Sequence, residues 1–416
     1  MLLNNPFQHD SRVLKEGRTL HRAGYDVRLV AVAADDLPRQ EHREGIRVMR
    51  VDRQPRTMRL VEWLQARRPP AAPGGSGPAP PGGARIVGLA ARARILAGRA
   101  YGVMAWLRFA RAGLRETCRE PAEIVLSHDL DTLPVAAVAA RRLGARLLYD
   151  SHEVFAELAG HTPLARRRWL AVERALLPKV ESMWMSSPGH AEVFARNHGV
   201  PVPPVIVNVP SLDPDPRAAG VPDLHAELGL ADGLRIVLYI GGVYPHRPLD
   251  VLLEAAAELE DCAMVIMGPA LPKYVDELRE RARGRGIAKR LRIAPPVPIA
   301  DVVRYAAAGD VGVIPFLNTS LNNFHGLPNK IFEYIAAGIP VVASDFPQLR
   351  AVIDRYDVGA TYDPDRPGAL VGAIREVLGD QARLAELRAN ATAAASELNW
   401  EVESRRLLEL VDANGR

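Results

Sequence analysis

Short apolar runs alternate with amphipathic stretches along most of the chain, and this alternation predicts parallel strands connected by helices. The apolar runs of the second half predict strands at 235–240, 262–267, 291–294 and 311–315. The amphipathic stretches around them predict helices at 248–259, 274–283, 299–308, 367–378 and 400–411. Residues 1–33 predict a strand–helix–strand unit, and the same alternation continues from 122 to 208. The fold class is therefore predicted to be α/β, with two Rossmann-like halves.

The most informative stretch runs from Phe324 to Ser344 and predicts a loop, a helix, a turn and a strand. Asn329 is a favourable N-cap, and Lys330–Ala337 suits a short helix. Gly338 suits the position that ends this helix. The apolar run that follows predicts a buried parallel strand.

Two charged residues, Lys330 and Glu333, interrupt this mostly apolar helix and share one face near its N-terminus. The free N–H groups of a helix N-terminus favour phosphate, and a lysine adds to that field. A carboxylate can accept hydrogen bonds from ribose hydroxyls. The pair therefore indicates a site for a phosphorylated sugar nucleotide. The alternative is an ordinary ion pair between positions i and i+3 on an exposed face.

The chain length of 416 residues predicts two domains. We expect an N-terminal domain over 1–210, a linker over 211–233, a C-terminal domain over 234–396, and a helix at 397–416 that packs back toward the N-terminal domain. Residues 67–84 are rich in proline, glycine and alanine, and are expected to form a disordered insert. Loops that follow the strands of both halves are expected to face a cleft, where small molecules bind.

Charge is unevenly distributed between the two halves. Residues 1–210 contain 31 Lys and Arg against 20 Asp and Glu, whereas the remainder contains 22 against 29. Residues 85–115 contain seven arginines and no acid, interleaved with large apolar side chains, which is typical of a helix that can lie on anionic lipid. An ordinary domain helix with solvated arginines is the alternative. We expect no nucleic-acid partner.

No run of about 18 uncharged apolar residues is present, and the N-terminal sequence is unlike a signal peptide. The two cysteines, Cys118 and Cys262, are far apart and lack the spacing of a metal site. They argue for a reducing compartment and against a disulfide framework. We therefore expect a cytoplasmic protein, with peripheral contact at the inner membrane face as a further hypothesis.

Polar loops follow the predicted strands of the first half, at the edge where open parallel sheets bind ligands. They contain His128, Asp129, Asp131, His152 and Glu153. The D-x-D spacing of the two aspartates also occurs in metal sites, so a bound cation is an alternative for them. For His152 and Glu153, a hydrogen-bonded pair that anchors the loop is as acceptable as an acceptor-site role. No G-x-G-x-x-G follows the first strand, which disfavours a dinucleotide-dependent dehydrogenase.

Five motifs resemble those of the group 1 (family 4) retaining glycosyltransferases, whose GT-B fold has two Rossmann-like doubly wound domains that face each other across a cleft. They cover nearly the whole chain in the family's order: NNPFQHDSRVLKE at 4–16, LSHDLDTLP at 126–134, YDSHEVF at 149–155, YIGGVYPHRPLDVLLEA at 239–255 and GLPNKIFEYIAAGIPVVAS at 326–344. The resemblance implies an enzyme that binds a nucleotide-sugar donor mainly in its C-terminal domain and an acceptor mainly in its N-terminal domain. It implies no metal and no other cofactor.

The resemblance also implies roles for individual residues. Glu333 would hold the donor ribose, Arg247 and Lys330 would contact the diphosphate during catalysis, and His128 would lie next to the donor sugar. The other donor-binding residues would be Gly241, Gly242, Pro296, Val297, His325, Gly326 and Leu327. The acceptor side would include Asn5, Asp10, His152 and Glu153.

The implied function is transfer of a hexose-type sugar from a nucleoside diphosphate to a glycan or lipid-linked acceptor, with retention of configuration, in the biosynthesis of a cell-envelope polysaccharide. Two departures keep alternatives open. His325 stands where many members have a glutamate, and Pro248 stands where a glycine is common, so that one N–H is lost. The alternatives are a sugar-nucleotide hydrolase or epimerase on the same fold, and a non-catalytic binding or scaffold protein.

Overall fold

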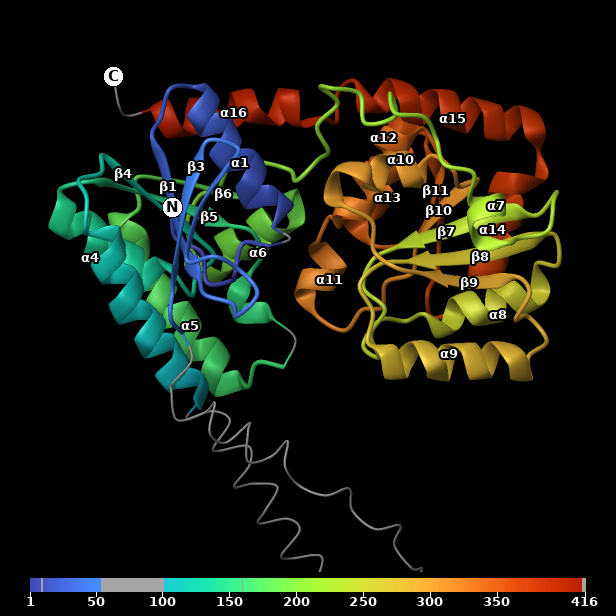
Figure 1. The fold of residues 1–416 in the computed structure, drawn as a ribbon, viewed down its shortest axis with the longest axis horizontal. Helices are drawn as coiled ribbons and strands as arrows, with labels where there is room; N and C mark the ends of the chain where they lie inside the picture. Colours follow the sequence, from blue (N-terminus) through green and yellow to red (C-terminus); the bar gives the residue numbers. More distant parts are fainter. Residues whose placement is uncertain (9, 54–100, 159, 414–416) are drawn as a thin grey trace, which may run out of the picture. The chain divides into compact units, whose positions relative to one another are not determined.

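The structure is a computed structural model that describes residues 1–8, 10–53, 101–158 and 160–413. Its contacts divide the chain into two units (Figure 1). The first comprises Met1–Val13, Leu20–Tyr149 and Leu176–Glu181, and the second comprises Leu14–Thr19, Asp150–Ala175 and Ser182–Arg416. The insert expected at 67–84 and most of the basic stretch at 85–115 lie outside the described residues. The domain boundaries given above stay a prediction.

Strands and helices alternate along the described chain. The strands are β1 (Val27–Val32), β2 (Gln40–Arg43), β3 (Ile46–Val51), β4 (Ile124–His128), β5 (Arg146–Ser151), β6 (Ser182–Met185), β7 (Arg235–Ile240), β8 (Cys262–Met267), β9 (Leu291–Ala294), β10 (Val311–Ile314), β11 (Val341–Ser344) and β12 (Gly359–Tyr362). The helices are α1 (Ser11–Arg22), α4 (Leu133–Leu143), α5 (Pro163–Leu176), α6 (Pro188–His198), α7 (Leu224–Leu228), α8 (Asp250–Glu258), α9 (Pro272–Gly284), α10 (Val302–Ala306), α11 (Leu321–His325), α12 (Asn329–Ala337), α13 (Pro347–Tyr356), α14 (Ala369–Gly379), α15 (Gln381–Ala395) and α16 (Trp400–Asp412). Residues 101–117 are also helical, and short 3-10 turns lie at Phe155–Glu157, Leu177–Lys179 and Ile299–Asp301.

An apolar stub at Leu2 and Leu3 takes the place of the first strand predicted within residues 1–33. Leu2 forms parallel bridges with Val30 of β1 and with Ser127 of β4. Its side chain is fully buried. On the other side of β1, β3 pairs in parallel, and β2 joins β3 in an antiparallel hairpin. Because β1, β3, β4 and the stub run parallel, the loops that follow them share one edge.

The second unit contains one parallel sheet with the strand order β12-β11-β10-β7-β8-β9. Strands β8, β10 and β11 are apolar and buried on both faces, as expected for the central strands of a parallel sheet covered by helices. The buried cluster on one face joins alternate strand residues, such as Val237 and Tyr239, to α8, α9 and α14 (Figure 1). The carboxyl ends of β7, β8, β9 and β10 therefore lie along one edge of this sheet.

Helix α12 confirms the predicted helix but begins one residue earlier. Pro328 occupies the N-cap position, and Asn329 Oδ1 accepts a hydrogen bond from Asn208 Nδ2 at 3.0 Å instead of capping the helix. Gly338 ends the helix with a φ of 73°, as predicted.

The strand expected at 204–208 is reduced to a single bridge between Val205 and Met185. Three prolines at 201, 203 and 204 lack the N–H groups that a longer ladder needs. Among the helices that the structure describes, none is both long enough and apolar enough to cross a membrane.

Candidate active site

Two glycine turns form the floor of the candidate site, at the carboxyl ends of β7 and β8. The N–H of Gly241 donates to Met267 O at 2.8 Å, so the first turn is tied to β8. A Cβ at Gly268 would lie 2.1 Å from Gly241 O, and a Cβ at Gly241 would lie 2.6 Å from Lys330 Cε. Backbone therefore packs directly on backbone, and a ligand can approach the main chain closely.

Arg247 and Lys330 converge on one aromatic ring beside the first glycine turn. Arg247 Cζ lies 6.0 Å and Lys330 Nζ lies 5.6 Å from the centre of the Phe316 ring. Lys330 Nζ also lies 5.2 Å from the centre of the Tyr239 ring. In the part of the chain that the structure describes, neither cation forms an ion pair with a carboxylate, and Arg247 Nε has no hydrogen-bond partner. Two adjacent cations without an acidic partner create a potential that attracts an anion.

The titration behaviour of Lys330 and Glu333 reflects this arrangement. Burial, reinforced by the charge of Arg247, lowers the pKa of Lys330 from 10.5 to about 8, although Glu333 acts in the opposite direction. Burial raises the pKa of Glu333, against the opposing charges of Lys330 and Lys15. Among the described residues no ion pair joins Lys330 to Glu333, and both side chains are half-buried, so the alternative of an exposed surface pair is wrong.

The sequence reasoning missed two residues that support this helix. Tyr334 is fully buried, and its hydroxyl accepts from Ile240 N at 3.0 Å and donates to Leu238 O at 3.2 Å, which fixes α12 against β7. Lys15 of α1 donates to Val209 O and lies 4.9 Å from the centre of the Trp400 ring. Tyr334 could have been singled out as a polar group on the buried face of α12. The electrostatic influence of Lys15 on Glu333 leaves no pattern in the sequence.

The loop His325–Leu327 leads from α11 into α12. The His325 ring packs edge-on against Phe324, with 5.0 Å between the ring centres. Burial, assisted by the charge of Arg196, lowers the pKa of His325. A Cβ at Gly326 would lie 2.5 Å from Asn322 O, so only glycine fits there without displacing the chain. The loop therefore reaches the N-terminus of α12 along a tightly packed path.

Pro296 and Val297 follow β9, the strand at one end of the sheet. Pro296 is exposed and Val297 is half-buried. Because the strands are parallel, both residues share the carboxyl edge with the glycine turns, although β8 separates β9 from β7. The structure thus brings the predicted residues of the second half to one sheet edge and to the adjoining helix N-terminus. Their individual roles stay predictions.

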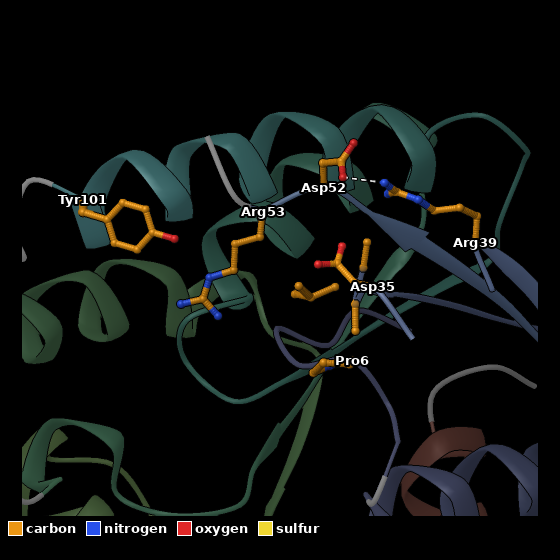
Figure 2. A pocket seen from close by; sticks show the side chains of 9 residues that line it. Pro6, Asp35, Arg39, Asp52, Arg53 and Tyr101 are labelled. Atoms are coloured by element: carbon orange, nitrogen blue, oxygen red, sulfur yellow. Dashed lines mark hydrogen bonds and ion pairs between the residues drawn. The ribbon is translucent and has the colours of Figure 1, made fainter. Parts of the chain in front are cut away.

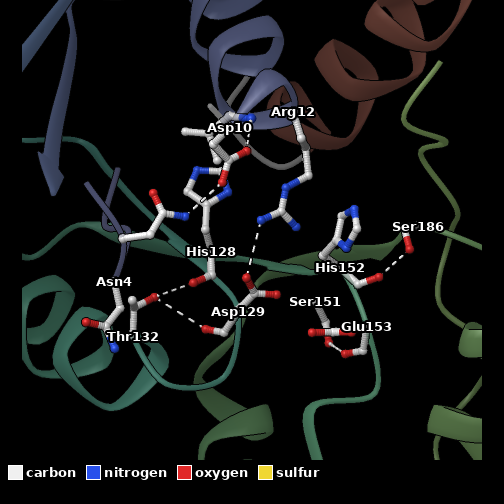
Figure 3. Close-up of polar contacts among 12 residues, drawn as sticks. Asn4, Asp10, Arg12, His128, Asp129, Thr132, Ser151, His152, Glu153 and Ser186 are labelled. Carbon is white, nitrogen blue, oxygen red and sulfur yellow. Dashed lines mark hydrogen bonds and ion pairs between the residues drawn. The ribbon is translucent and has the colours of Figure 1, made fainter. Parts of the chain in front are cut away.

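Polar residues of the first unit gather at the carboxyl end of β4 (Figure 3). Asn5 Nδ2 donates to Asp10 Oδ2 at 3.0 Å, and Val13 N donates to Asp10 Oδ1 at 3.1 Å, so Asp10 caps α1. Burial alone would raise the pKa of Asp10, but Arg12, the Asn5 amide, Val13 N and His128 together lower it. His128 itself is fully buried. The structure therefore joins Asn5, Asp10 and His128, three of the predicted site residues.

Both aspartates of the D-x-D sequence have partners in the protein. Arg12 Nη2 lies 3.3 Å from Asp129 Oδ2, and Asn4 Nδ2 donates to Asp131 Oδ2 at 2.6 Å. Burial raises the pKa of Asp131 to about 6. Asp129 has a φ of 63°, a conformation that non-glycine residues rarely adopt, so its loop carries backbone strain.

His152 and Glu153 follow β5 in the second unit (Figure 3). His152 O accepts a hydrogen bond from Ser186 Oγ, and Glu153 O accepts one from Ser151 Oγ at 3.3 Å. These bonds hold the loop through its main chain. The acceptor-side roles of the two side chains stay predictions.

The first unit contains a pocket of about 420 Å³ that no sequence motif predicted (Figure 2). It lies where β1, β3 and the N-terminal stub end. Its lining combines two arginines, two aspartates and an aromatic ring with small residues: Pro6, Val32, Ala33, Ala34, Asp35, Arg39, Asp52, Arg53 and Tyr101. Arg39 and Asp52 form an ion pair at 2.7 Å. Its volume and mixed lining are those of a small-molecule site.

Two protein-family profiles match the chain. The profile described as "Glycosyl transferases group 1" matches residues 235–380, and the one described as "Glycosyl transferase 4-like domain" matches residues 54–210. Among relatives, a D-inositol 3-phosphate glycosyltransferase from Rhodococcus opacus is 30% identical over 322 residues, which cover 72% of this chain and 70% of the relative. The protein of that name from Thermobispora bispora is 31% identical over 218 residues, or 49% of this chain and 48% of the relative.

Solved structures share the architecture at lower identity. Sucrose-phosphate synthase from Thermosynechococcus elongatus superposes with a TM-score of 0.71 at 19% identity, covering 96% of this chain and 92% of the other. Anabaena HepE in complex with UDP-glucose superposes with a TM-score of 0.70 at 15% identity, covering 99% and 98%. These similarities confirm the predicted GT-B fold.

Proposed function

The chain belongs to the group 1 glycosyltransferases, and from that premise we propose that it transfers a sugar from a nucleoside diphosphate donor to a glycan or lipid-linked acceptor, with retention of configuration. The observation that carries the proposal is the pair of cations, Arg247 and Lys330, beside Gly241 and the N-terminus of α12. A donor diphosphate supplies the negative charge that this pair lacks. The N-terminus of α12 supplies further N–H donors for phosphate oxygens.

Glu333 supports a nucleotide rather than a simple phosphate. It lies three residues after Lys330, and therefore on the same face of α12. An ionised carboxylate can accept hydrogen bonds from two neighbouring hydroxyls, such as those of a ribose. Such bonds would also stabilise the charged form, which burial disfavours in the free protein.

The transfer breaks the bond between the anomeric carbon and the leaving diphosphate and forms a bond from the same carbon to an acceptor hydroxyl oxygen. Arg247, Lys330 and the N–H groups of α12 stabilise the negative charge that develops on the leaving group. In the front-side mechanism that we propose, the acceptor proton passes to the departing phosphate oxygen, which remains on the side of attack. No side-chain nucleophile is needed, and configuration is retained.

A donor screen tests this proposal. Thermal unfolding is measured with UDP-, GDP-, ADP- and dTDP-sugars at up to millimolar concentration. A donor at 100 times its dissociation constant should stabilise the protein by about 2.7 kcal/mol. Arg247→Ala and Glu333→Ala should remove this shift, whereas Arg285→Ala, an exposed arginine on the same unit, should keep it. No shift with any donor would contradict the proposal.

The acceptor site that we propose is the pocket of the first unit (Figure 2). Arg53 forms no ion pair with any described carboxylate, and with Asp35 and Tyr101 it offers hydrogen bonds and an aromatic surface to a polyol or a sugar phosphate. Because the relatives are named D-inositol 3-phosphate glycosyltransferases, D-inositol 3-phosphate is the first acceptor to test.

An assay of nucleotide release separates the alternatives. Nucleotide release that depends on an added acceptor identifies a transferase, and release without one identifies the hydrolase alternative. Binding without any turnover identifies the scaffold alternative.

Membrane contact is supported by the described end of the basic stretch. On the helix over 101–117, Val103, Met104 and Leu107 are 60%, 50% and 43% exposed. Arg108, Arg111 and Arg115, also exposed, continue the same face. We propose that this face binds anionic lipid. Met104→Asp should abolish co-sedimentation with vesicles containing phosphatidylserine, while Val138→Asp, at an equally exposed site on α4, should not. Equal loss of co-sedimentation in both variants would refute this proposal.

A cytoplasmic location and a role in envelope polysaccharide synthesis stay predictions.

A further inference from the structure

Helix α11 is held at both ends by hydrogen bonds to distant parts of the sequence, in the same unit. Asn322 Oδ1 accepts from Val154 N at 3.0 Å, and Asn322 Nδ2 donates to Val154 O at 3.2 Å. The amide therefore pairs with both main-chain groups of Val154, as a neighbouring strand would. At the other end, Ser187 Oγ donates to His325 O at 2.9 Å.

His190 adds a third bond to this contact. Its Nε2 lies 3.1 Å from Asn322 O, and since a carbonyl oxygen only accepts, Nε2 carries the proton. Burial lowers the pKa of His190, so the neutral ring is the form that makes this bond near pH 7. His190 N donates in turn to Ser187 Oγ at 3.1 Å, which caps α6. The polar groups from α6 are thus arranged to bind α11.

Two glycines allow the close approach that these bonds require. A Cβ at Gly189 would lie 2.7 Å from His325 O, and one at Gly326 would lie 2.5 Å from Asn322 O. Asn322 and Val154 are nearly excluded from solvent. A buried amide that satisfies both groups of a buried peptide is costly to remove, because its partners are then left unpaired.

The two segments joined by this contact, around Val154 and around α11, contain predicted substrate-binding residues. The resemblance implies an acceptor-side role for His152 and Glu153, which precede Val154, and a donor-binding role for His325–Leu327, at the end of α11. We propose that Asn322 is a positioning residue that, with His190 and Ser187, couples the acceptor-side loop to the donor-side loop. Order imposed on one loop by its substrate is then transmitted to the other. The inference rests on the proposed function for the identity of the two loops, although the coupling itself does not require it.

Hydrogen–deuterium exchange tests the coupling in the full-length protein. Asn322→Ala is compared with Asn323→Ala, because Asn323 lies on the same helix but its side chain, among the described residues, bonds only to nearby Thr319 Oγ1, at 2.8 Å. In the free protein, Asn322→Ala should speed exchange about tenfold in peptides covering 152–158 as well as 321–327. Asn323→Ala should leave 152–158 unchanged. Unchanged exchange at 152–158 in Asn322→Ala would overturn the proposal, whether or not a nucleotide binds.

Nucleotide then tests whether the coupling is used. UDP or GDP at 1 mM should protect both peptides of the wild type, but only 321–327 in Asn322→Ala. His190→Gln, which retains a donor near Nε2, should behave like the wild type, and His190→Ala should not. If nucleotide still protects residues 152–158 in Asn322→Ala, the proposal that order passes from one loop to the other through Asn322 is wrong. If nucleotide protects neither peptide in any protein, the proposed donor site is contradicted. The exchange rates of the nucleotide-free proteins still test the coupling in that case.

Discussion

Raising the pH from 7 to 9 is expected to weaken nucleoside diphosphate binding about tenfold, because Lys330 loses its proton in the free protein within this range. Burial and the charge of Arg247 set the pKa of Lys330 at about 8 in the free protein. A bound diphosphate opposes both effects and returns the pKa toward 10.5. The protonated lysine is the form that attracts the anion, so affinity falls as this form is depleted.

The magnitude follows from the pKa of Lys330. With a pKa of about 8, roughly nine tenths of the free protein carries the proton at pH 7 and roughly one tenth carries it at pH 9. The ratio corresponds to about 1.4 kcal/mol of binding free energy.

The same pKa has the opposite effect on folding. The pKa of Lys330 in the folded protein lies below its value of 10.5 in the unfolded chain. The charge on Lys330 therefore lowers the free energy of unfolding below pH 8, and this cost disappears as the pH rises toward 10.5. Weaker binding at pH 9 is therefore not a sign of unfolding.

Isothermal titration calorimetry with UDP, or with the nucleotide that the donor screen selects, measures this dependence at pH 7, 8 and 9 and constant ionic strength. Lys330→Arg is the matched control, because arginine stays charged throughout the range. Between pH 7 and pH 9, the affinity of the wild type should fall about ten times further than that of the variant. Titration of the nucleobase affects both proteins equally, so the comparison removes it. Parallel pH profiles for the two proteins would refute the reasoning.

Three substitutions test other parts of the structure. Gly241→Ala should weaken nucleotide binding about tenfold by calorimetry, because its Cβ displaces the Lys330 amine, whereas Gly372→Ala, with no atom within 4 Å, should have no effect. Tyr334→Phe should lower the free energy of unfolding in urea by about 1–3 kcal/mol, because buried groups of Ile240 and Leu238 lose their partner; an unchanged midpoint would contradict these bonds. His198→Ala should cost about 1–3 kcal/mol in the same assay, since it removes a hydrogen bond of 2.8 Å to the buried Glu173, and an unchanged midpoint would show that this bond is not needed.

The sequence predicted those elements whose local pattern agrees with their final environment. β7 and β8 are continuous apolar runs because helices cover both faces of the sheet, and such runs are visible without any tertiary information. α12 was located by its turn, its apolar face and Gly338, all of them local signals. The cap was misplaced by one residue because Asn329 bonds to Asn208, 121 positions away.

Elements that depend on tertiary contacts were missed. α15 is alanine-rich and its apolar residues follow no clear helical period, so only its packing against α12 reveals it as a core element. β3 alternates between buried and half-buried positions beside a short hairpin, and no turn signal singled it out. In the site, charged residues could be predicted from motifs, but the rings that lie beside Lys330 come from β7 (Tyr239) and from the loop after β10 (Phe316). Their proximity is a property of the fold.

The contrast between the glycine floor and the loop after β9 has an evolutionary consequence. At Gly241 and Gly268 a side chain would collide with backbone or with Lys330, so random mutation there removes the site instead of altering it. Pro296 is exposed in the loop after β9, so substitutions there should cost little folding free energy. The resemblance implies that Pro296 and Val297 hold the donor base, and on that prediction diversification should alter the preferred nucleobase before it alters the handling of phosphate. A laboratory library aimed at new donors should begin at Pro296 and Val297.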